Sequence, residues 1–186
     1  MSPDDRVLLS TYGSQWLPLP LDSMTISFPD QRSPSALDTV INQFHVDVSP
    51  RYRPVGGTTY CNIFAWDWSR AMHAEIPHWV DSDWLACSHR TPGARETTVN
   101  LLFPKLQTGM WGWHQCDQDT ARSMANKGLP AVTAWRNPKG PGHIAVVLPT
   151  VPGEPETMVA QAGSVCSRGL TLRRAFGELR LESLVF

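Results

Sequence analysis

The sequence lacks the features that mark several large classes of protein. No window of about 18 consecutive apolar residues is present, so no membrane-spanning helix is predicted. Lys and Arg number 16 against 17 Asp and Glu, and a formal net charge of −1 argues against a nucleic-acid partner. The opening residues, MSPDDRVLLSTYG, lack the basic and apolar regions of a secretory signal. We therefore expect a protein made in the cytoplasm, or one exported without a cleaved leader.

Cysteine is scarce and irregularly spaced. The four cysteines form no C-x-x-C motif, which excludes a zinc ribbon and a thioredoxin motif. C-S-H and H-Q-C each place one residue between a Cys and a His, and an extended backbone would turn both side chains to one face. This spacing is shorter than zinc sites use, so we expect no metal and no cofactor. The alternative is a zinc site formed by Cys87, His89, His114 and Cys116.

Prolines divide the chain into two parts. WLPLPLD and FPDQRSP interrupt any regular period, so residues 1–32 are predicted to form a proline-rich N-terminal arm. Residues 33–186 are long enough to bury a hydrophobic core, and we expect them to form one domain.

Three helices are predicted in the first two thirds of the chain. Residues 33–44 begin with Ser and Pro, which suit the N-cap and the first helical position, and their apolar residues follow a helical period. A second helix, capped by Thr58 or Thr59, is predicted to run to about Glu75. A third, within residues 117–130, has Asp at its start and Gly and Pro at its end.

After residue 130 the period becomes that of strands. Short runs rich in β-branched residues occupy 131–137, 143–149 and 157–163, with Gly and Pro between them. Residues 170–176 and 180–186 are candidates for further strands. Helices first and antiparallel strands second predict an α+β fold with helices on one face of a sheet.

Cys61 is the first candidate for chemistry. It lies at the start of the second predicted helix, after Gly56 and Gly57. A helix N-terminus stabilises a thiolate, which makes the thiol a nucleophile, and its free backbone N–H groups can hold an oxyanion. The alternative is a small buried residue, since free cysteines are often buried.

His143 and Gln161 are the second and third candidates. His143 begins a predicted strand, which is a rigid position for a general base. If Leu148 pairs with Thr157 in a hairpin, His143 lies opposite Ala162 and beside Gln161. The amide oxygen of Gln161 would then accept the imidazole N–H and fix its tautomer, which is the orienting role in a triad.

Four further residues are candidates for substrate binding. Tyr60 and Asn62 flank the nucleophile and would either line the oxyanion site or cap the helix. Trp111 and Trp113, in GMWGWHQ, belong to the irregular segment 77–118, which is predicted to shape a groove.

The ordered set TTYCNIFAWDWSRAM, ANKGLPAVTAW, GPGHIAVVLP and VAQAGS resembles the papain-like amidohydrolases of the NlpC and CHAP kind, over roughly residues 35–165. The resemblance implies a papain-like α+β fold with N-terminal helices packed on a C-terminal antiparallel sheet. It also implies that Cys61 is the nucleophile, His143 the general base and then acid, and Gln161 the orienting residue. Two departures stand out: the third residue is more often Asn, Asp, Glu or His, and the Asp that usually precedes the Cys is here Tyr60.

The function that the resemblance implies is a peptidoglycan-degrading thiol amidase or endopeptidase that cleaves stem or cross-link peptides. Delivery to the periplasm or cell wall would be by a phage lysis system or by a secretion machine, as for a type VI amidase effector. In the latter case a cognate inhibitor protein is an expected partner. Two alternatives remain: a glutamine deamidase effector that acts on a protein, and a catalytically inert interaction domain of a phage or secretion apparatus.

Overall fold

The computed structural model describes residues 15–150, 153 and 155–186, so much of the expected arm lies outside the described residues. Helices and antiparallel strands are mixed, which confirms the predicted α+β class. None of the described helices is long and apolar enough to cross a membrane. The helices are α2 (Pro34–Asn42), α3 (Cys61–Ala71), α4 (Val99–Gln107), α5 (Gln118–Asn126) and α6 (Leu172–Phe176), with 3-10 turns at Leu21–Ser23, Pro29–Gln31, Met110–Gly112 and Glu178–Ser183.

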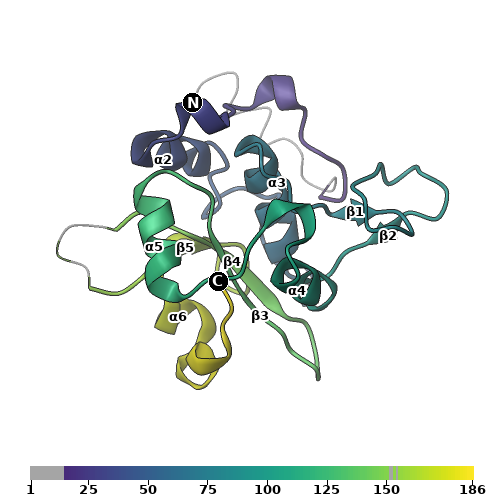
Figure 1. Cartoon of the computed structure of the whole chain (residues 1–186). Coiled ribbons are helices and arrows are strands. Elements are labelled where there is room, and N and C mark those ends of the chain that lie inside the picture. The colour runs from purple at the N-terminus through teal and green to yellow at the C-terminus, as the bar shows by residue number, and fades with distance from the viewer. Residues whose placement is uncertain (1–14, 151–152, 154) are drawn as a thin grey trace.

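Four antiparallel strands form the main sheet, in the order β3-β4-β5-β6. A separate hairpin of β1 and β2 projects from the side of the molecule near α4 (Figure 1). The three predicted strands within 131–137, 143–149 and 157–163 are thus confirmed. The bounds of the strands are β1 (Trp79–Val80), β2 (Arg95–Glu96), β3 (Val132–Trp135), β4 (His143–Val147), β5 (Met158–Gln161) and β6 (Ser167–Thr171).

The C-terminal segments differ from the prediction. Residues 170–176 end β6 and then form α6, because the Thr171 side chain accepts the N–H of Arg174 and caps a helix that buries Leu172 and Phe176. These two buried residues are four apart, which is the helical repeat. The strand predicted at 180–186 is reduced to one bridge, between Val185 and Ala134, after a 3-10 turn.

Two predicted helices are confirmed with their caps. The Ser33 hydroxyl accepts the N–H of Ala36 at 3.1 Å at the start of α2, and Asp117 accepts the N–H of Thr120 at 2.7 Å at the start of α5. Gly128 follows α5 with a φ of 77°. A Cβ there would lie 2.3 Å from the backbone of Ser33, so the contact between the two helices requires glycine.

Helix α3 differs from the prediction at both ends. Its N-cap is Tyr60, with no side-chain cap, so the expected cap by Thr58 or Thr59 is wrong. It ends at Ala71 rather than Glu75, and His73 just beyond has a φ of 51°, which is incompatible with a continuing right-handed helix. The start of this helix is therefore set by its surroundings rather than by a capping side chain.

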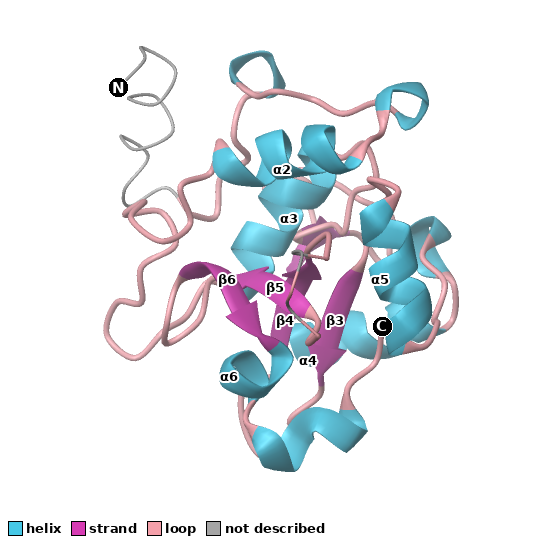
Figure 2. Cartoon of the chain, turned by 90° about the vertical axis from the view of Figure 1, so that its left-hand side faces the viewer, coloured by secondary structure: helices cyan, strands magenta, loops and turns pink. Residues whose placement is uncertain are grey.

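The core lies between α3 and the sheet. Helix α3 packs mainly on β4, and Ile144 to Val147 are all fully buried, so both faces of β4 are covered, whereas we expected helices on one face only. Figure 2 shows the four strands across the middle of the molecule, with α2 and α3 above them in this view and α6 below.

A buried ionic network connects α3 to segments that precede it in the chain. Asp67 is 0% exposed and accepts hydrogen bonds from Arg51 Nε at 2.6 Å and from Tyr52 Oη at 2.9 Å. Arg51 also donates from Nη2 to the Leu17 carbonyl at 2.8 Å. The network thus ties the helix to the loop before it and to the described part of the arm.

The described part of the arm, residues 15–32, packs on the rest of the chain. Leu19 and Met24 are buried in the same core as α3. The Leu19 carbonyl accepts a hydrogen bond from Arg70 at 2.9 Å, and the backbone N–H of Ser27 donates to Ala71 at 2.8 Å. These contacts hold the arm against the end of α3, whereas Trp16 lies near the start of the helix, where its ring packs edge-on against Tyr60.

Removal of the buried charge tests the importance of the network. We expect Asp67→Asn to lower the free energy of unfolding by roughly 3–5 kcal/mol, because Arg51 then stays buried without its carboxylate. Asp38→Asn is the matched control, since Asp38 pairs with Arg168 at the surface and its loss should cost about 1 kcal/mol or less. Urea unfolding of both variants gives the two values, and equal values would contradict a structural role for the network.

Candidate active site

Cys61 is the first residue of α3, and its side chain is 4% exposed beside β4. The backbone N–H groups of Ile144, Asn62 and Cys61 itself act on the sulfur and favour the thiolate. Burial has the larger and opposite effect, and it raises the pKa of the Cys61 thiol above its usual value. In the free protein the thiol is therefore neutral at neutral pH, so a nucleophilic Cys61 needs a base.

His143 and Gln161 form a hydrogen-bonded pair. The distance between His143 Nε2 and Gln161 Oε1 is 2.7 Å, and Gln161 is 3% exposed. Gln161 Nε2 donates to the Val165 carbonyl at 3.0 Å, which leaves the amide oxygen for the imidazole. His143 Nε2 must therefore carry the proton, and the lone pair of the ring is on Nδ1.

The sheet register brings this pair together, and it differs by one residue from the expected register. Val146 pairs with Ala160 and Val147 with Val159, and the backbone N–H of Leu148 bonds to Met158 rather than Thr157. Continued in this register, Gln161 faces Ala145. Side chains two residues apart share a face, so His143 and Gln161 lie diagonally on the same face. The expected register would have put them on opposite faces.

The surroundings of His143 hold the ring in place. It packs on Phe176 with ring centroids 4.9 Å apart, and a Cβ on Gly163 would lie 3.1 Å from its Cε1. Burial lowers the pKa of His143, Arg180 acts in the same direction, and the hydrogen bond to Gln161 partly offsets both. A neutral imidazole at neutral pH is the state that can accept a proton.

Two adjoining cavities meet at this site. One, of about 370 Å³, is lined by Cys61, and the other, of about 300 Å³, by His143 and Gln161. Thr59, Pro141 and Gly142 line both. Among the described residues no hydrogen bond joins the Cys61 thiol to His143, although the N–H of Ile144, the next residue, acts on that thiol.

Asn100 of α4 shapes the loop between the cavities. Its amide nitrogen donates to the carbonyls of Asn137 and Gly140, both at 2.9 Å, and its oxygen accepts the N–H of Asn137. A Cβ on Gly142 would lie 2.7 Å from both Asn100 Oδ1 and the Trp135 carbonyl. Glycine is thus required just before His143, where the loop passes close to α4 and β3.

Tyr60 and Asn62, which the sequence placed beside the nucleophile, both line the cavity of Cys61. Tyr60 is the N-cap of α3, and its ring packs edge-on against Trp16. Asn62 does not cap the helix: its Nδ2 donates to the Thr97 carbonyl at 2.9 Å and lies 3.4 Å from His78 Nδ1. Asn62 therefore connects α3 to the β1–β2 hairpin.

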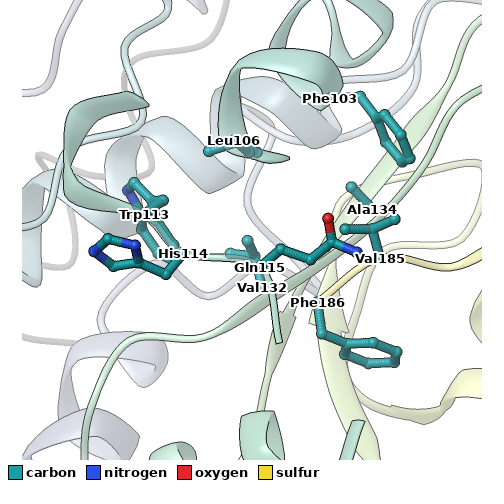
Figure 3. Close-up of a pocket in the computed structure, with 9 residues that line it drawn as sticks. All are labelled: Phe103, Leu106, Trp113, His114, Gln115, Val132, Ala134, Val185 and Phe186. Carbon is teal, nitrogen blue, oxygen red and sulfur yellow. The ribbon is translucent and has the colours of Figure 1, made fainter. Parts of the chain in front are cut away.

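Trp111 and Trp113 lie elsewhere. Both line a cavity of about 550 Å³ that also involves Arg32, and neither lines the cavities of Cys61 and His143. Trp113 also borders a small apolar cavity between α4, β3 and the C-terminal residues (Figure 3). Trp111 has a φ of 57° and donates to the Trp84 carbonyl at 2.8 Å. Both tryptophans thus belong to a region separate from the cavities of Cys61 and His143.

The residues of the zinc alternative are in different loops. Cys87 and His89 lie between β1 and β2, while His114 and Cys116 lie between the 3-10 turn at 110–112 and α5. Within the described ranges, no group of three or more His, Cys, Asp or Glu residues has the geometry to hold a metal ion.

Several residues at the site were not predicted from the sequence. Trp16 and Glu96 line the cavity of Cys61, and Phe176 and Arg180 line that of His143. Strands of two residues, as in β1 and β2, leave no periodic pattern, so nothing in the sequence marks Glu96. A tryptophan within a proline-rich arm was the available signal for Trp16.

Comparison with known proteins gives no match: no protein-family model, no curated protein and no solved structure is similar to the chain. The chemistry of the site therefore has to be argued from its own geometry.

The hydrogen bond between His143 and Gln161 can be tested by NMR. We expect the imidazole to titrate below pH 6.5 and to carry its neutral proton on Nε2. In Gln161→Met the titration midpoint should fall further, because the acceptor that favours the imidazolium is lost, and the tautomers should mix. Gln118→Met is the control, since Gln118 bonds to Thr157 outside the site. A wild-type proton on Nδ1 would contradict the arrangement.

Proposed function

We propose that the protein is a cysteine hydrolase of amide bonds with a papain-like fold. The observation that carries the proposal is the His143–Gln161 pair at 2.7 Å, which leaves Nδ1 as the basic atom on β4. This strand packs against α3, and its Ile144 N–H acts on Cys61 at the start of that helix. A cysteine on that helix end and an oriented imidazole on the facing strand are the parts that nucleophilic catalysis requires. The order of the elements, α3 before β3 to β6, fits the papain-like resemblance.

The first half of the reaction forms a thioester. The Cys61 proton passes to His143 Nδ1 as the sulfur attacks the carbonyl carbon of the bound amide. Negative charge moves to the carbonyl oxygen, which the free N–H groups at the start of α3 can stabilise. The imidazolium then gives the Nδ1 proton to the amide nitrogen, the C–N bond breaks and the amine leaves.

The second half releases the acid. A water molecule gives a proton to His143 Nδ1 and its oxygen attacks the thioester carbon. The C–S bond breaks, Cys61 recovers the proton, and the carboxylic acid leaves. Throughout, Gln161 Oε1 accepts the hydrogen bond from Nε2–H and keeps Nδ1 on the side of the substrate, so Gln161 acts as a positioning residue.

Peptidoglycan is the substrate that we propose first, on the resemblance to NlpC and CHAP hydrolases. The cleaved bond would be an amide of the stem or cross-link peptide, and the site of action the periplasm or cell wall. If the protein is an effector, a protein inhibitor in the producing cell is an expected partner.

Digestion of purified peptidoglycan, with the fragments identified by mass spectrometry, tests the proposal. We expect new stem-peptide ends from the wild type and none from Cys61→Ala or His143→Ala, which lack the nucleophile and the base. Gln161→Ala should retain activity lowered roughly 10- to 100-fold, as for outer-shell residues that orient a histidine. Cys87→Ala, which removes a thiol outside both cavities, should match the wild type.

An intact wall would contradict peptidoglycan as the substrate. Ammonia released from a protein by the wild type but not by Cys61→Ala would then favour the glutamine deamidase. No activity in either assay would favour the inert interaction domain.

The pH dependence of kcat/KM follows from the two pKa shifts. A protonated His143 cannot accept the thiol proton, and burial lowers the pKa of His143, so the acid limb should have its midpoint below 6.5. On the alkaline side, kcat/KM falls when Cys61 and His143 lose the proton that they share. Because burial raises the pKa of Cys61, the midpoint of this alkaline limb should lie above 9.0. A rate profile of the wild type checks both limbs. A plateau narrower than this range would contradict a buried, neutral pair.

A further inference from the structure

We propose that the cavity beside Cys61 binds a primary ammonium group of the substrate, through Glu96 and Asn62, on the acyl side of the scissile amide. The inference rests on the proposed amide hydrolase. It adds a requirement on the substrate: an unblocked amino group on, or next to, the residue whose carbonyl is attacked.

The mechanism assigns the two cavities to the two sides of the substrate. The leaving amine must receive its proton from His143, so this part of the substrate lies in the cavity that His143 lines. The acyl part becomes attached to Cys61 and extends away from His143. The cavity lined by Cys61 but not by His143 therefore holds the acyl part.

Asn62 presents an acceptor to this cavity. Its Nδ2 is committed to the Thr97 carbonyl at 2.9 Å and to His78 Nδ1 at 3.4 Å. Burial lowers the pKa of His78 to about 4, so its ring is neutral and Nδ1 can accept that hydrogen bond. No described residue donates to Asn62 Oδ1, which leaves this oxygen for a donor on the substrate.

Glu96 supplies the charge. It is the one charged residue among the described residues that line the cavity of Cys61. Its Oε1 accepts the indole N–H of Trp16 at 3.1 Å, and that same oxygen lies 3.4 Å from His78 Nε2. His78 is neutral, so this contact does not cancel the charge. The second carboxylate oxygen has no partner among the described residues.

The fit is specific to a cation with N–H groups. An ammonium has three donors and no acceptor, which matches a carboxylate and an amide oxygen. A carboxylate or phosphate in the same place would face a negative charge and no Lys or Arg. A cavity of about 370 Å³ is within the range of roughly 300–1,000 Å³ that small ligands use.

The charge preference of the Cys61 thiol tests the site without any substrate. Aminoethyl and sulfonatoethyl methanethiosulfonate modify thiols with a cationic and an anionic group, and peptide mapping isolates the rate at Cys61. Each rate at Cys61 is divided by the rate of the same reagent with glutathione, which corrects for the intrinsic reactivity of the reagent. In the wild type, we expect this ratio to be about tenfold larger for the cationic reagent than for the anionic one, equivalent to about 1.4 kcal/mol. Glu96→Gln, which keeps an acceptor for Trp16, should remove the preference. Glu182→Gln, at the exposed C-terminal 3-10 turn, should keep it.

Hydrolysis of paired substrates separates this inference from the proposed function. Each pair consists of a wall fragment or peptide whose acyl-side amine is either free or acetylated. We expect kcat/KM to be about tenfold higher for the free amine in the wild type, and equal for the two substrates in Glu96→Gln. A cation preference at Cys61 without hydrolysis would support the ammonium site and contradict the hydrolase. Hydrolysis that ignores acetylation, or a Cys61 that shows no charge preference, would overturn the ammonium site.

Discussion

The position of the candidate site depends on the contacts of the buried Asp67 carboxylate. It is fully buried on the same helix as Cys61, and Arg51 and Tyr52 hold it from the loop that precedes that helix. A buried ion pair is weak evidence of net stability, but once present it tolerates little displacement, because each charge depends on the other. Tyr60 gives α3 no side-chain cap, so the position of its first turn rests on this network and on packing against β4. The Leu17 carbonyl joins the same guanidinium, which links the placement of Trp16 to that of Cys61.

Burial has opposite consequences for the pKa values of Cys61 and His143. It raises the pKa of Cys61 and lowers that of His143, so that both are neutral in the free protein. In the mechanism that we propose, a thiolate–imidazolium pair is then formed during the reaction rather than before it. The low polarity that opposes this pair also strengthens the hydrogen bond to Gln161, because water competes less for its partners. The two pKa shifts therefore favour, within the proposed mechanism, general-base activation of Cys61 by His143 over a thiolate formed in advance by the helix N-terminus.

Local signals predicted the α+β class and the helix and strands that carry the candidate site, but not the register of those strands. Ser33 and Asp117 were found because a cap is a contact within four residues. The segment 170–176 was ambiguous, since its apolar residues fit a strand as well as the helix that buries Leu172 and Phe176. The pairing of β4 with β5 depends on long-range packing, and a shift of one residue decides whether His143 and Gln161 share a face. Trp111 and Trp113 were placed near the site by their glycine-rich context alone, and that context says nothing about which cavity they line.

The two cavities are lined by residues of opposite charge, and this asymmetry bears on the proposed catalysis as well as on the proposed binding. Glu96 lines the cavity of Cys61, whereas Arg180 lines that of His143, where it stacks over Trp135 at 4.5 Å and donates to the Phe176 carbonyl. Arg180 lowers the pKa of His143 by charge repulsion. An anionic group on the leaving part of a substrate would offset that repulsion and make the imidazole a stronger base when the thiol proton has to move. Thr59, Pro141 and Gly142 line both cavities, so the two charges lie on either side of a shared boundary. In the proposed mechanism, an anionic leaving part would thus raise the basicity of Nδ1 when it occupies the cavity that Arg180 lines.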